Sequence, residues 1–419
     1  MVGHTTMKTI SKICFIVVVL YVVILLEENK NGNYLYGLYD KVKHSRIITL
    51  KQSTSSTSKV DDDNHQKCPS VLDKMVVGYW NSKPLTKKQS LEMVTFLNAS
   101  RTQHRLPSPL QRPDLKCGNV TFPLSFSPAM KWFRAVCDPH GKTPCCYNNK
   151  CSSRTTEQCK CRNCYDMRPY KHGEYSDFKP NDKRCKIRRY NHTEACQLLD
   201  GATLYLNGDS YIRHLYTALL IFLRNNTFDG AMKRGVPKAK HDKCTGMYMF
   251  TEKVCRGQLD HNVKDLCHGQ FRLMFTYYYK SASGPNFVKM INSIKHAPKS
   301  LVVFGIGIHD GFNVQNITKN FIAPVVNTIG NKTWPKLLWT TPHCPSILNL
   351  RLDYQVPRFI AKMEPVLYKY NVPVFNTYNM TKGMVSFDGS HYGLGINIWK
   401  LQILLNYIQS LKDRGVWKK

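Results

Sequence analysis

Acidic residues are scarce in this chain, which has 28 Asp and Glu against 60 Lys and Arg and a formal net charge of +32. Such an excess of positive charge attracts polyanions over a long range. The basic residues are scattered, however, and the sequence lacks any zinc-finger, homeodomain or RNA-recognition signature, which argues against nucleic acid as the partner. An anionic glycan, an anionic membrane face or a phosphorylated acyl donor fits the charge better. A basic surface that only confers solubility stays open.

A single unbroken apolar run lies near the start of the chain, from Ile13 to Leu26. Lysines precede this run and Glu27 and Glu28 follow it, which favours a cytosolic N-terminus. No small-x-small cleavage site follows the run. We therefore predict a type II signal anchor that crosses a thin bilayer, with a cleaved signal peptide as the alternative.

Sequons and cysteines predict that the rest of the chain lies in an oxidising, extracytosolic compartment. Of the 16 cysteines, 15 follow the apolar run, and most of them should form disulfides there. Their odd number predicts a free thiol or an intermolecular bridge, such as a disulfide-linked dimer. Seven Asn-x-Ser/Thr sequons are predicted glycosylation sites, at Asn98, Asn119, Asn191, Asn225, Asn316, Asn331 and Asn379.

The composition changes along the chain and predicts its domain organisation. A polar, low-complexity stretch follows the apolar run and reads as a disordered stem. Eleven cysteines then lie between Cys68 and Cys196, which predicts a loop-rich, disulfide-bonded region, with a zinc site as a weaker alternative because Cys161 and Cys164 form a C-x-x-C pair. The predicted bounds are 1–9 for a cytosolic tail, 10–26 for the anchor, 27–66 for the stem, 67–199 for the cysteine-rich region and 200–419 for a catalytic domain.

Strand-like and helix-like patterns alternate after residue 200. The predicted strands are 202–208, 271–279, 301–308, 336–341 and 372–376, and the predicted helices between and after them are 285–294, 316–328, 354–370 and 396–411. Repeated βα units predict an α/β fold with a mostly parallel sheet between helices. Active sites in such sheets lie at the carboxyl ends of the strands.

Ser210 follows the first of these strands and begins the helix after it, in the sequence Asn-Gly-Asp-Ser. A serine at such a turn has its hydroxyl at the sheet edge, near backbone N–H groups that stabilise an oxyanion. Gly208 permits the tight turn. The alternative interpretation is that Asp209 and Ser210 form an N-cap pair.

Asp388 and His391 lie three residues apart, between the last predicted strand and the last predicted helix. A serine nucleophile needs a base, which is usually histidine, and the histidine needs a carboxylate to fix its tautomer. One short loop provides both groups here. Taken singly, Asp388 also fits a turn residue and His391 a surface histidine.

These segments together resemble the SGNH (GDSL-like) hydrolases and acyltransferases. They are similar in particular to the neurexophilin-and-PC-esterase family, which is related to the trichome-birefringence-like and sialate O-acetyltransferases. The resemblance covers roughly residues 200–419 and lies in the segments NGDSYIRHLYTAL, GIGIHDGF and DGSHYGLGINIWKLQILLNYI. It implies a three-layer α/β/α catalytic domain in which Ser210 is the nucleophile, His391 the base and Asp388 its orienting acid.

The resemblance also implies a set of residues for oxyanion or substrate binding, namely Gly208, Asp209, Arg213 and His309. Arg213 would either bind a substrate anion or brace the loop. His309 stands where SGNH enzymes have the asparagine of a Gly-x-Asn-Asp block, and it would donate to the oxyanion, bind the acceptor or be a structural histidine. The glycine of the second block is not located, and Gly230 and Gly246 are both candidates.

The implied activity is transfer of an acetyl group onto a hydroxyl of a secretory-pathway glycan, with sialic acid as one candidate acceptor. A carbohydrate acetylesterase with the same triad, or an inactive secreted binding protein, is the alternative. We expect no bound cofactor or metal, and acetyl-CoA is a candidate acyl donor. The predicted partners are an anionic glycan or glycoprotein and, through the anchor, the membrane. The predicted location is the Golgi membrane with the catalytic part in the lumen, or outside the cell if the anchor is cleaved.

Overall fold

A computed structural model describes residues 68–106, 110–122, 133–350 and 352–417. The predicted tail, anchor and stem lie outside the described residues. Within the ranges above, no helix is both long and apolar enough to cross a membrane. The described residues belong to one compact unit, and the division into two domains near residue 200 stays a prediction.

Five parallel strands form the central sheet, in the order β10-β9-β8-β6-β7. The predicted, mostly parallel sheet is therefore confirmed. Four strands lie within the ranges predicted for them, and β8 begins one residue before its predicted range. The strands are β6 (Thr203–Gly208), β7 (Arg272–Thr276), β8 (Ser300–Gly305), β9 (Lys336–Thr340) and β10 (Val374–Phe375).

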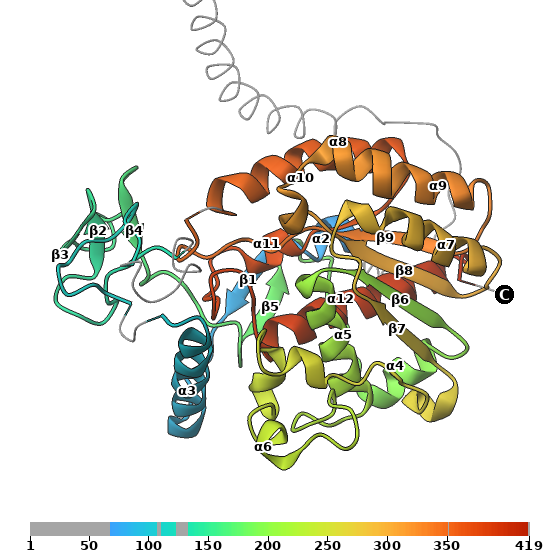
Figure 1. The fold of residues 1–419 in the computed structure, drawn as a ribbon, viewed down its shortest axis with the longest axis horizontal. Helices are drawn as coiled ribbons and strands as arrows, with labels where there is room; N and C mark the ends of the chain where they lie inside the picture. Colours follow the sequence, from blue (N-terminus) through green and yellow to red (C-terminus); the bar gives the residue numbers. More distant parts are fainter. Residues whose placement is uncertain (1–67, 107–109, 123–132, 351, 418–419) are drawn as a thin grey trace, which may run out of the picture. The chain divides into compact units, whose positions relative to one another are not determined.

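Helices cover both faces of this sheet, which gives the three layers seen in Figure 1. Side chains of β8 alternate between two apolar cores, with Leu301 and Val303 on one face and Val302 and Phe304 on the other. The first face carries α4 (His192–Leu198), α5 (Ser210–Leu223) and α12 (Leu394–Asp413). The other face carries α7 (Gly284–Ile294), α8 (Val314–Ile317), α9 (Ala323–Ile329) and α10 (Leu352–Lys369).

One predicted helix differs from the structure. The stretch predicted as a single helix over 316–328 is divided into α8, a π-helical turn over Thr318–Ile322, and α9. Pro324 lies in the first turn of α9 and has no N–H to donate. A regular hydrogen-bond ladder therefore cannot run through this point. The short helices α6 (Lys238–His241) and α11 (Thr377–Thr381) complete this part of the fold.

Apart from one helix of 17 residues, α3, the cysteine-rich region contains only short elements. They are α2 (Val71–Lys74), β1 (Gly78–Asn81), α3 (Lys87–Gln103), β2 (Cys145–Tyr147), β3 (Lys150–Ser152), β4 (Cys164–Asp166) and β5 (Asp177–Pro180). Strand β1 pairs with β5, and β2 lies between β3 and β4. Five disulfides lie within this region: Cys68–Cys185, Cys117–Cys146, Cys137–Cys151, Cys145–Cys159 and Cys161–Cys164.

Two further disulfides, Cys196–Cys267 and Cys244–Cys255, pair all but one of the cysteines that the structure describes. The remaining one is Cys344, a half-buried free thiol. The free thiol that the odd count predicts is therefore found in this chain, and a disulfide-linked dimer stays a prediction. Each group of cysteines that lies close enough together to hold a metal consists of residues from these disulfides. The C-x-x-C pair, Cys161 and Cys164, is itself one of the disulfides in this structure.

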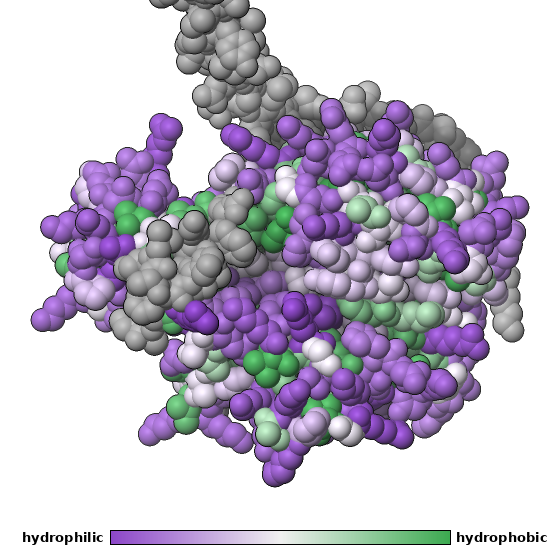
Figure 2. All heavy atoms as spheres, in the orientation of Figure 1, coloured by the Kyte–Doolittle hydropathy of each residue, from purple (hydrophilic) through white to green (hydrophobic). Residues whose placement is uncertain are grey.

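The surface agrees with the predicted exposure of the sequons in most cases. Hydrophilic residues cover most of the face seen in Figure 2, with hydrophobic residues in small scattered groups. Asn98 and Asn379 are half-buried. The other sequon asparagines are exposed, namely Asn119, Asn191, Asn225, Asn316 and Asn331. Glycosylation of all seven stays a prediction.

Candidate active site

Ser210 lies where β6 ends and α5 begins, at the carboxyl edge of the sheet. The preceding residue, Asp209, is the N-cap of α5 and accepts a hydrogen bond from the backbone N–H of Tyr211 at 3.0 Å. Gly208 allows the turn to lie directly against β8, because a Cβ atom there would lie 2.3 Å from the carbonyl oxygen of Gly305. The serine is thus fixed at the positive end of a helix dipole.

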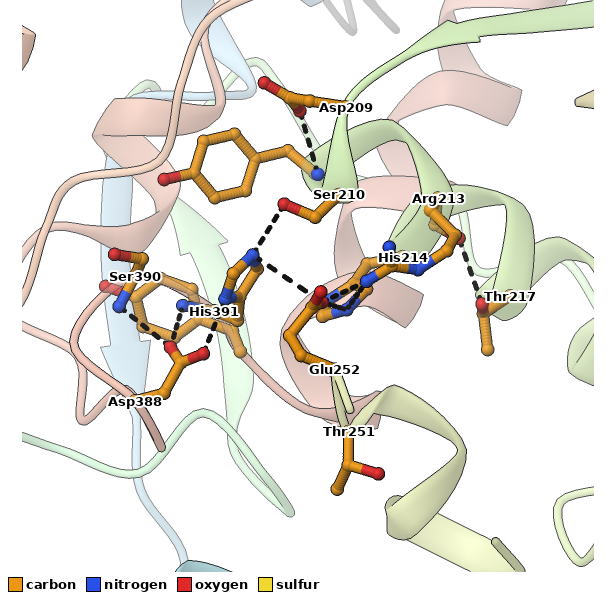
Figure 3. Close-up of polar contacts among 12 residues, drawn as sticks. Asp209, Ser210, Arg213, His214, Thr217, Thr251, Glu252, Asp388, Ser390 and His391 are labelled. Carbon is orange, nitrogen blue, oxygen red and sulfur yellow. Dashed lines mark hydrogen bonds and ion pairs between the residues drawn. The ribbon is translucent and has the colours of Figure 1, made fainter. Parts of the chain in front are cut away.

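The loop between α11 and α12 brings Asp388 and His391 to this serine, as Figure 3 shows. The imidazole Nε2 of His391 lies 2.7 Å from Ser210 Oγ, and its Nδ1 lies 2.7 Å from Asp388 Oδ2. Asp388 Oδ1 also accepts the backbone N–H groups of Ser390 at 3.0 Å and of His391 at 2.8 Å. The carboxylate therefore holds both the imidazole ring and the loop that carries it.

The charges in this chain of contacts favour an ionised carboxylate beside a basic imidazole. Burial opposes ionisation of Asp388, but the charge of His391 and the hydrogen bonds from His104 and His391 outweigh it, so the pKa of Asp388 lies well below its usual range. Burial likewise opposes protonation of His391, yet the charges of Asp388 and Glu252 raise its pKa above the ordinary value. The imidazole is thus a stronger base than a free histidine.

A second charged cluster, built around Glu252, lies on the other side of His391. Glu252 accepts hydrogen bonds from Arg213 and, at 2.8 Å, from His214 Nε2, and its Oε1 lies 3.6 Å from His391 Nε2. Burial opposes the charge of Glu252, but His391, Arg213 and His214 hold the pKa of its carboxyl well below the usual range. Burial lowers the pKa of His214 to about 4, so this histidine is neutral. His391 therefore faces a carboxylate at each ring nitrogen.

The guanidinium of Arg213 binds Glu252, and only 4% of the residue is exposed. This contact fits the bracing alternative, and the role of Arg213 stays a prediction. Glu252 itself has no signal in the sequence, since it follows a short 3₁₀ helix, Gly246–Phe250, in an irregular segment. His104 is also unexpected. It comes from the end of α3 in the cysteine-rich region, and its Nε2 lies 3.5 Å from Asp388 Oδ2.

A buried lysine supports the base loop from behind. Lys400 Nζ in α12 lies 2.8 Å from His343 Nε2 and 2.8 Å from Asn397 Oδ1. His343 Nδ1 in turn lies 3.3 Å from the carbonyl oxygen of Ser390, next to His391. Burial lowers the pKa of Lys400 to about 7. The position of this loop thus depends on a polar chain that starts in the core.

The remaining predicted site residues lie around this centre with different contacts. The side chain of Asp209 is buried, and burial raises the pKa of its carboxyl to about 7. His309 follows β8, is exposed and contacts the ring of Tyr279 edge-on at 5.3 Å. Among the described contacts, no hydrogen bond joins His309 to the triad. Its role in binding the oxyanion or the acceptor stays a prediction, as does the choice between Gly230 and Gly246.

Solved structures with partial likeness to this chain include two esterases. One is the native aryl esterase of M. smegmatis, with 14% identity, a TM-score of 0.30, and coverage of 50% of this chain and 99% of that chain. The other is a carbohydrate acetylesterase from Sinorhizobium meliloti, with 12% identity, a TM-score of 0.31, and coverage of 50% and 99%. No model of a known protein family matches the chain, and no curated protein does.

Proposed function

We propose that this chain is a serine acyltransferase or esterase of the SGNH type that acts on glycans. The observation that carries the proposal is the contact between Ser210 Oγ and His391 Nε2 at 2.7 Å, continued from His391 Nδ1 to Asp388 at 2.7 Å. Residues 181 positions apart meet in this contact. Nucleophile, base and orienting acid have the order and reach that acyl transfer through serine requires.

The first half of the reaction forms an acyl-serine. Ser210 Oγ attacks the acyl carbon of the donor while its proton moves to His391 Nε2. Asp388 and Glu252 flank the resulting imidazolium and stabilise its positive charge. The oxyanion lies at the N-terminus of α5, where the backbone N–H of Ser210 is one donor and His309 is a candidate for another. His391 then gives its proton to the leaving group of the donor.

The second half transfers the acyl group onward. His391 takes a proton from the acceptor hydroxyl, whose oxygen attacks the acyl carbon, and Ser210 Oγ leaves and regains the proton. Water and a sugar hydroxyl compete for the same acyl-serine, and exclusion of water decides between hydrolysis and transfer. We favour transfer of acetyl to a secretory-pathway glycan because the chain is similar to the neurexophilin-and-PC-esterase family in NGDSYIRHLYTAL and DGSHYGLGINIWKLQILLNYI.

The compartment is part of the same proposal. Seven disulfides and seven sequons fit a lumenal protein. The positive charge of +32 fits an acidic acceptor glycan. We propose the Golgi lumen as the site of action, a type II anchor as the attachment and acetyl-CoA as the acyl donor.

Covalent labelling tests the nucleophile. We expect a fluorophosphonate probe to label the full-length chain and the control variant Ser293→Ala, whose serine lies exposed in α7. The variant Ser210→Ala should not react, because the attacking hydroxyl is missing. Absence of labelling in the unaltered protein would sink the enzyme proposal and favour an inactive binding protein.

A second measurement separates transferase from esterase. The protein is incubated with radiolabelled acetyl-CoA, with and without sialylated or sulfated glycans. Transfer predicts label in the glycan fraction that depends on Ser210. Release of all label as free acetate, at a rate that the glycans do not change, would identify an esterase.

A further inference from the structure

Five aromatic rings form a continuous row at the carboxyl edge of the sheet, beside the proposed active site. Neighbouring ring centroids are 5.7, 6.3, 4.9 and 5.3 Å apart, within the range of favourable aromatic contacts. Three of the rings are exposed and the other two are half-buried. In order along the row, the residues are His261, Phe275, Tyr277, Tyr279 and His309.

The row follows from the geometry of β7. Phe275 lies near the end of β7, and the rings of Tyr277 and Tyr279 follow it at centroid distances of 6.3 and 4.9 Å. Strand β7 is the edge strand and pairs only with β6. It ends at Thr276, so the two tyrosines continue past the end of the sheet. Tyr277 is 42% exposed although its ring is stacked on that of Tyr279.

Strand register places this row next to Ser210. Thr276 pairs with Asn207, three residues before Ser210, and the next strand, β8, leads to His309. The row therefore runs from the end of β7 toward the end of β8 and passes the end of β6, which carries the nucleophile. Burial raises the pKa of Tyr277, and the charges of Arg213, Asp209 and Glu252 also act on its hydroxyl, in agreement with this position.

Exposed cations flank the row. Lys280 Nζ lies 5.6 Å from the centre of the Tyr279 ring. The charges of Arg256 and Lys233 act on Tyr277 and His261, together with the charges of the carboxylates Glu252 and Asp260. All three cations are exposed. A ligand on the row therefore meets flat apolar faces in the middle and positive charge at the sides.

We propose that the aromatic row is the acceptor subsite, and that it binds the pyranose rings of an acidic glycan. This inference rests on the proposed function and names its substrate class. A pyranose presents an apolar C–H face that can lie on a tyrosine ring, while its hydroxyls stay hydrated at the edge. Carboxylate or sulfate groups on neighbouring sugars reach the flanking cations, whose contacts are strongest with anions. The row thus delivers a sugar hydroxyl to the acyl group on Ser210.

The test is direct binding, which needs no catalysis. The probes are sialyllactose and a sulfated chondroitin hexasaccharide, with lactose as the neutral reference and adenosine 3′,5′-bisphosphate as the nucleotide part of coenzyme A. Calorimetric titration compares the full-length chain with Tyr277→Ala, Tyr277→Trp and Lys280→Gln. Tyr368→Ala is the matched control, because Tyr368 is 85% exposed on α10, on the other face of the sheet.

We expect at least one acidic glycan to bind, and Tyr277→Ala to weaken that binding about tenfold. Tyr277→Trp should restore it, because the flat face returns, and Tyr368→Ala should not change it. Lys280→Gln should reduce the preference for acidic over neutral glycans. Equal affinities of Tyr277→Ala and the parent chain, binding of no probe glycan, or a tyrosine-dependent site that takes only the nucleotide would each overturn the proposal.

The outcome is separable from that of the proposed function. Fluorophosphonate labelling of Ser210 together with glycan binding that ignores Tyr277 refutes the subsite alone. Glycan binding that requires Tyr277 in a chain that the probe does not label refutes the catalytic proposal alone.

Discussion

The cysteine-rich region and the parallel-sheet region of this molecule are held together by different forces. The first contains five disulfides between Cys68 and Cys185 and only small apolar clusters of its own. The second has two extended apolar cores, one on each face of the sheet. Short strands and loops bury little apolar surface among themselves, so covalent links supplement packing there. Residues of this region such as Trp80, Phe96 and Phe178 also pack into the first of the two cores.

This difference shows which region positions the side chains of the proposed active site. Ser210 and the loop of His391 are both attached to the sheet region, through α5 and α12, which pack against each other. The cysteine-rich region adds one contact to the triad, from His104 to Asp388, and it holds the start of α12 through Glu174, which accepts the N–H of Gly395. The stable core thus carries the reacting groups, and the disulfide-bonded region adjusts them.

Replacement of Asp388 should have the largest effect on activity and a smaller one on folding. Asp388→Asn keeps the size of the side chain but loses the charge that orients His391, and we expect kcat to fall about 10⁴-fold. The measurement is steady-state hydrolysis of an acetyl ester at constant pH. Asp182→Asn, at an exposed ion pair of the first region, is the control. A loss of less than tenfold would remove Asp388 from the triad.

Disulfide removal tests the covalent side of the comparison. The double variant Cys68→Ala/Cys185→Ala removes the disulfide that joins residues 117 positions apart. Loop-closure entropy predicts that this loss lowers the free energy of unfolding by about 5 kcal/mol. The same relation predicts about 1.6 kcal/mol for Cys161→Ala/Cys164→Ala, with a separation of 3 residues. Denaturant unfolding measures both. Equal losses in the two variants would contradict an entropic role for these links.

Glu252→Gln tests the second carboxylate beside His391. It leaves Arg213 buried without a charged partner, and removal of one member of a buried pair costs about 3–5 kcal/mol. It also removes a charge that raises the pKa of His391. Because the neutral imidazole is the active form, activity rises with pH through that pKa, and this acid limb should move to lower pH in the variant.

The measurement is the pH dependence of kcat/KM, with Glu157→Gln, at an exposed surface pair, as control. If Glu252→Gln is too unstable to assay, the double variant Arg213→Gln/Glu252→Gln takes its place, because it also removes the unpaired charge of Arg213. An acid limb that stays in place in both variants would refute an effect of Glu252 on the base.

His104→Ala should have the smallest effect. It removes the contact at 3.5 Å between His104 Nε2 and Asp388, and we expect a loss of about 1 kcal/mol in transition-state stabilisation. The exposed His140 belongs to the same region, and His140→Ala should leave kcat unchanged. Identical rates in both variants would show that the contact from His104 does not act on the site.

The sequence predicted the parts of this molecule that follow a local pattern. The five strands are apolar runs between turn residues, and Ser210 directly follows the first of them. His391 lies in the loop between α11 and α12, and its meeting with Ser210 agrees with the rule that sites lie at strand carboxyl ends. The split of the helix predicted over 316–328 was missed, although Pro324 marks the place. The periodicity of apolar residues is not changed by the loss of one backbone N–H donor at a proline.

The supporting charges could not be predicted. Glu252 and His104 come from irregular segments, and their positions depend on how distant parts of the chain pack. Lys400 lies in an apolar helix face where a lysine normally points to solvent, yet it is 1% exposed. Only His214 had a sequence signal, because it lies in the segment NGDSYIRHLYTAL, which carries the family resemblance. Long-range packing, which no local pattern encodes, decides these contacts.

The wide separation of Ser210 from His391 has a consequence for how the protein is made. The ribosome completes the nucleophile 181 residues before the base. Strands β7, β8, β9 and β10 must all be translated in the interval. A nascent chain therefore carries an inert serine while 181 further residues are added, and a message truncated anywhere before codon 391 yields a product without the reactive pair.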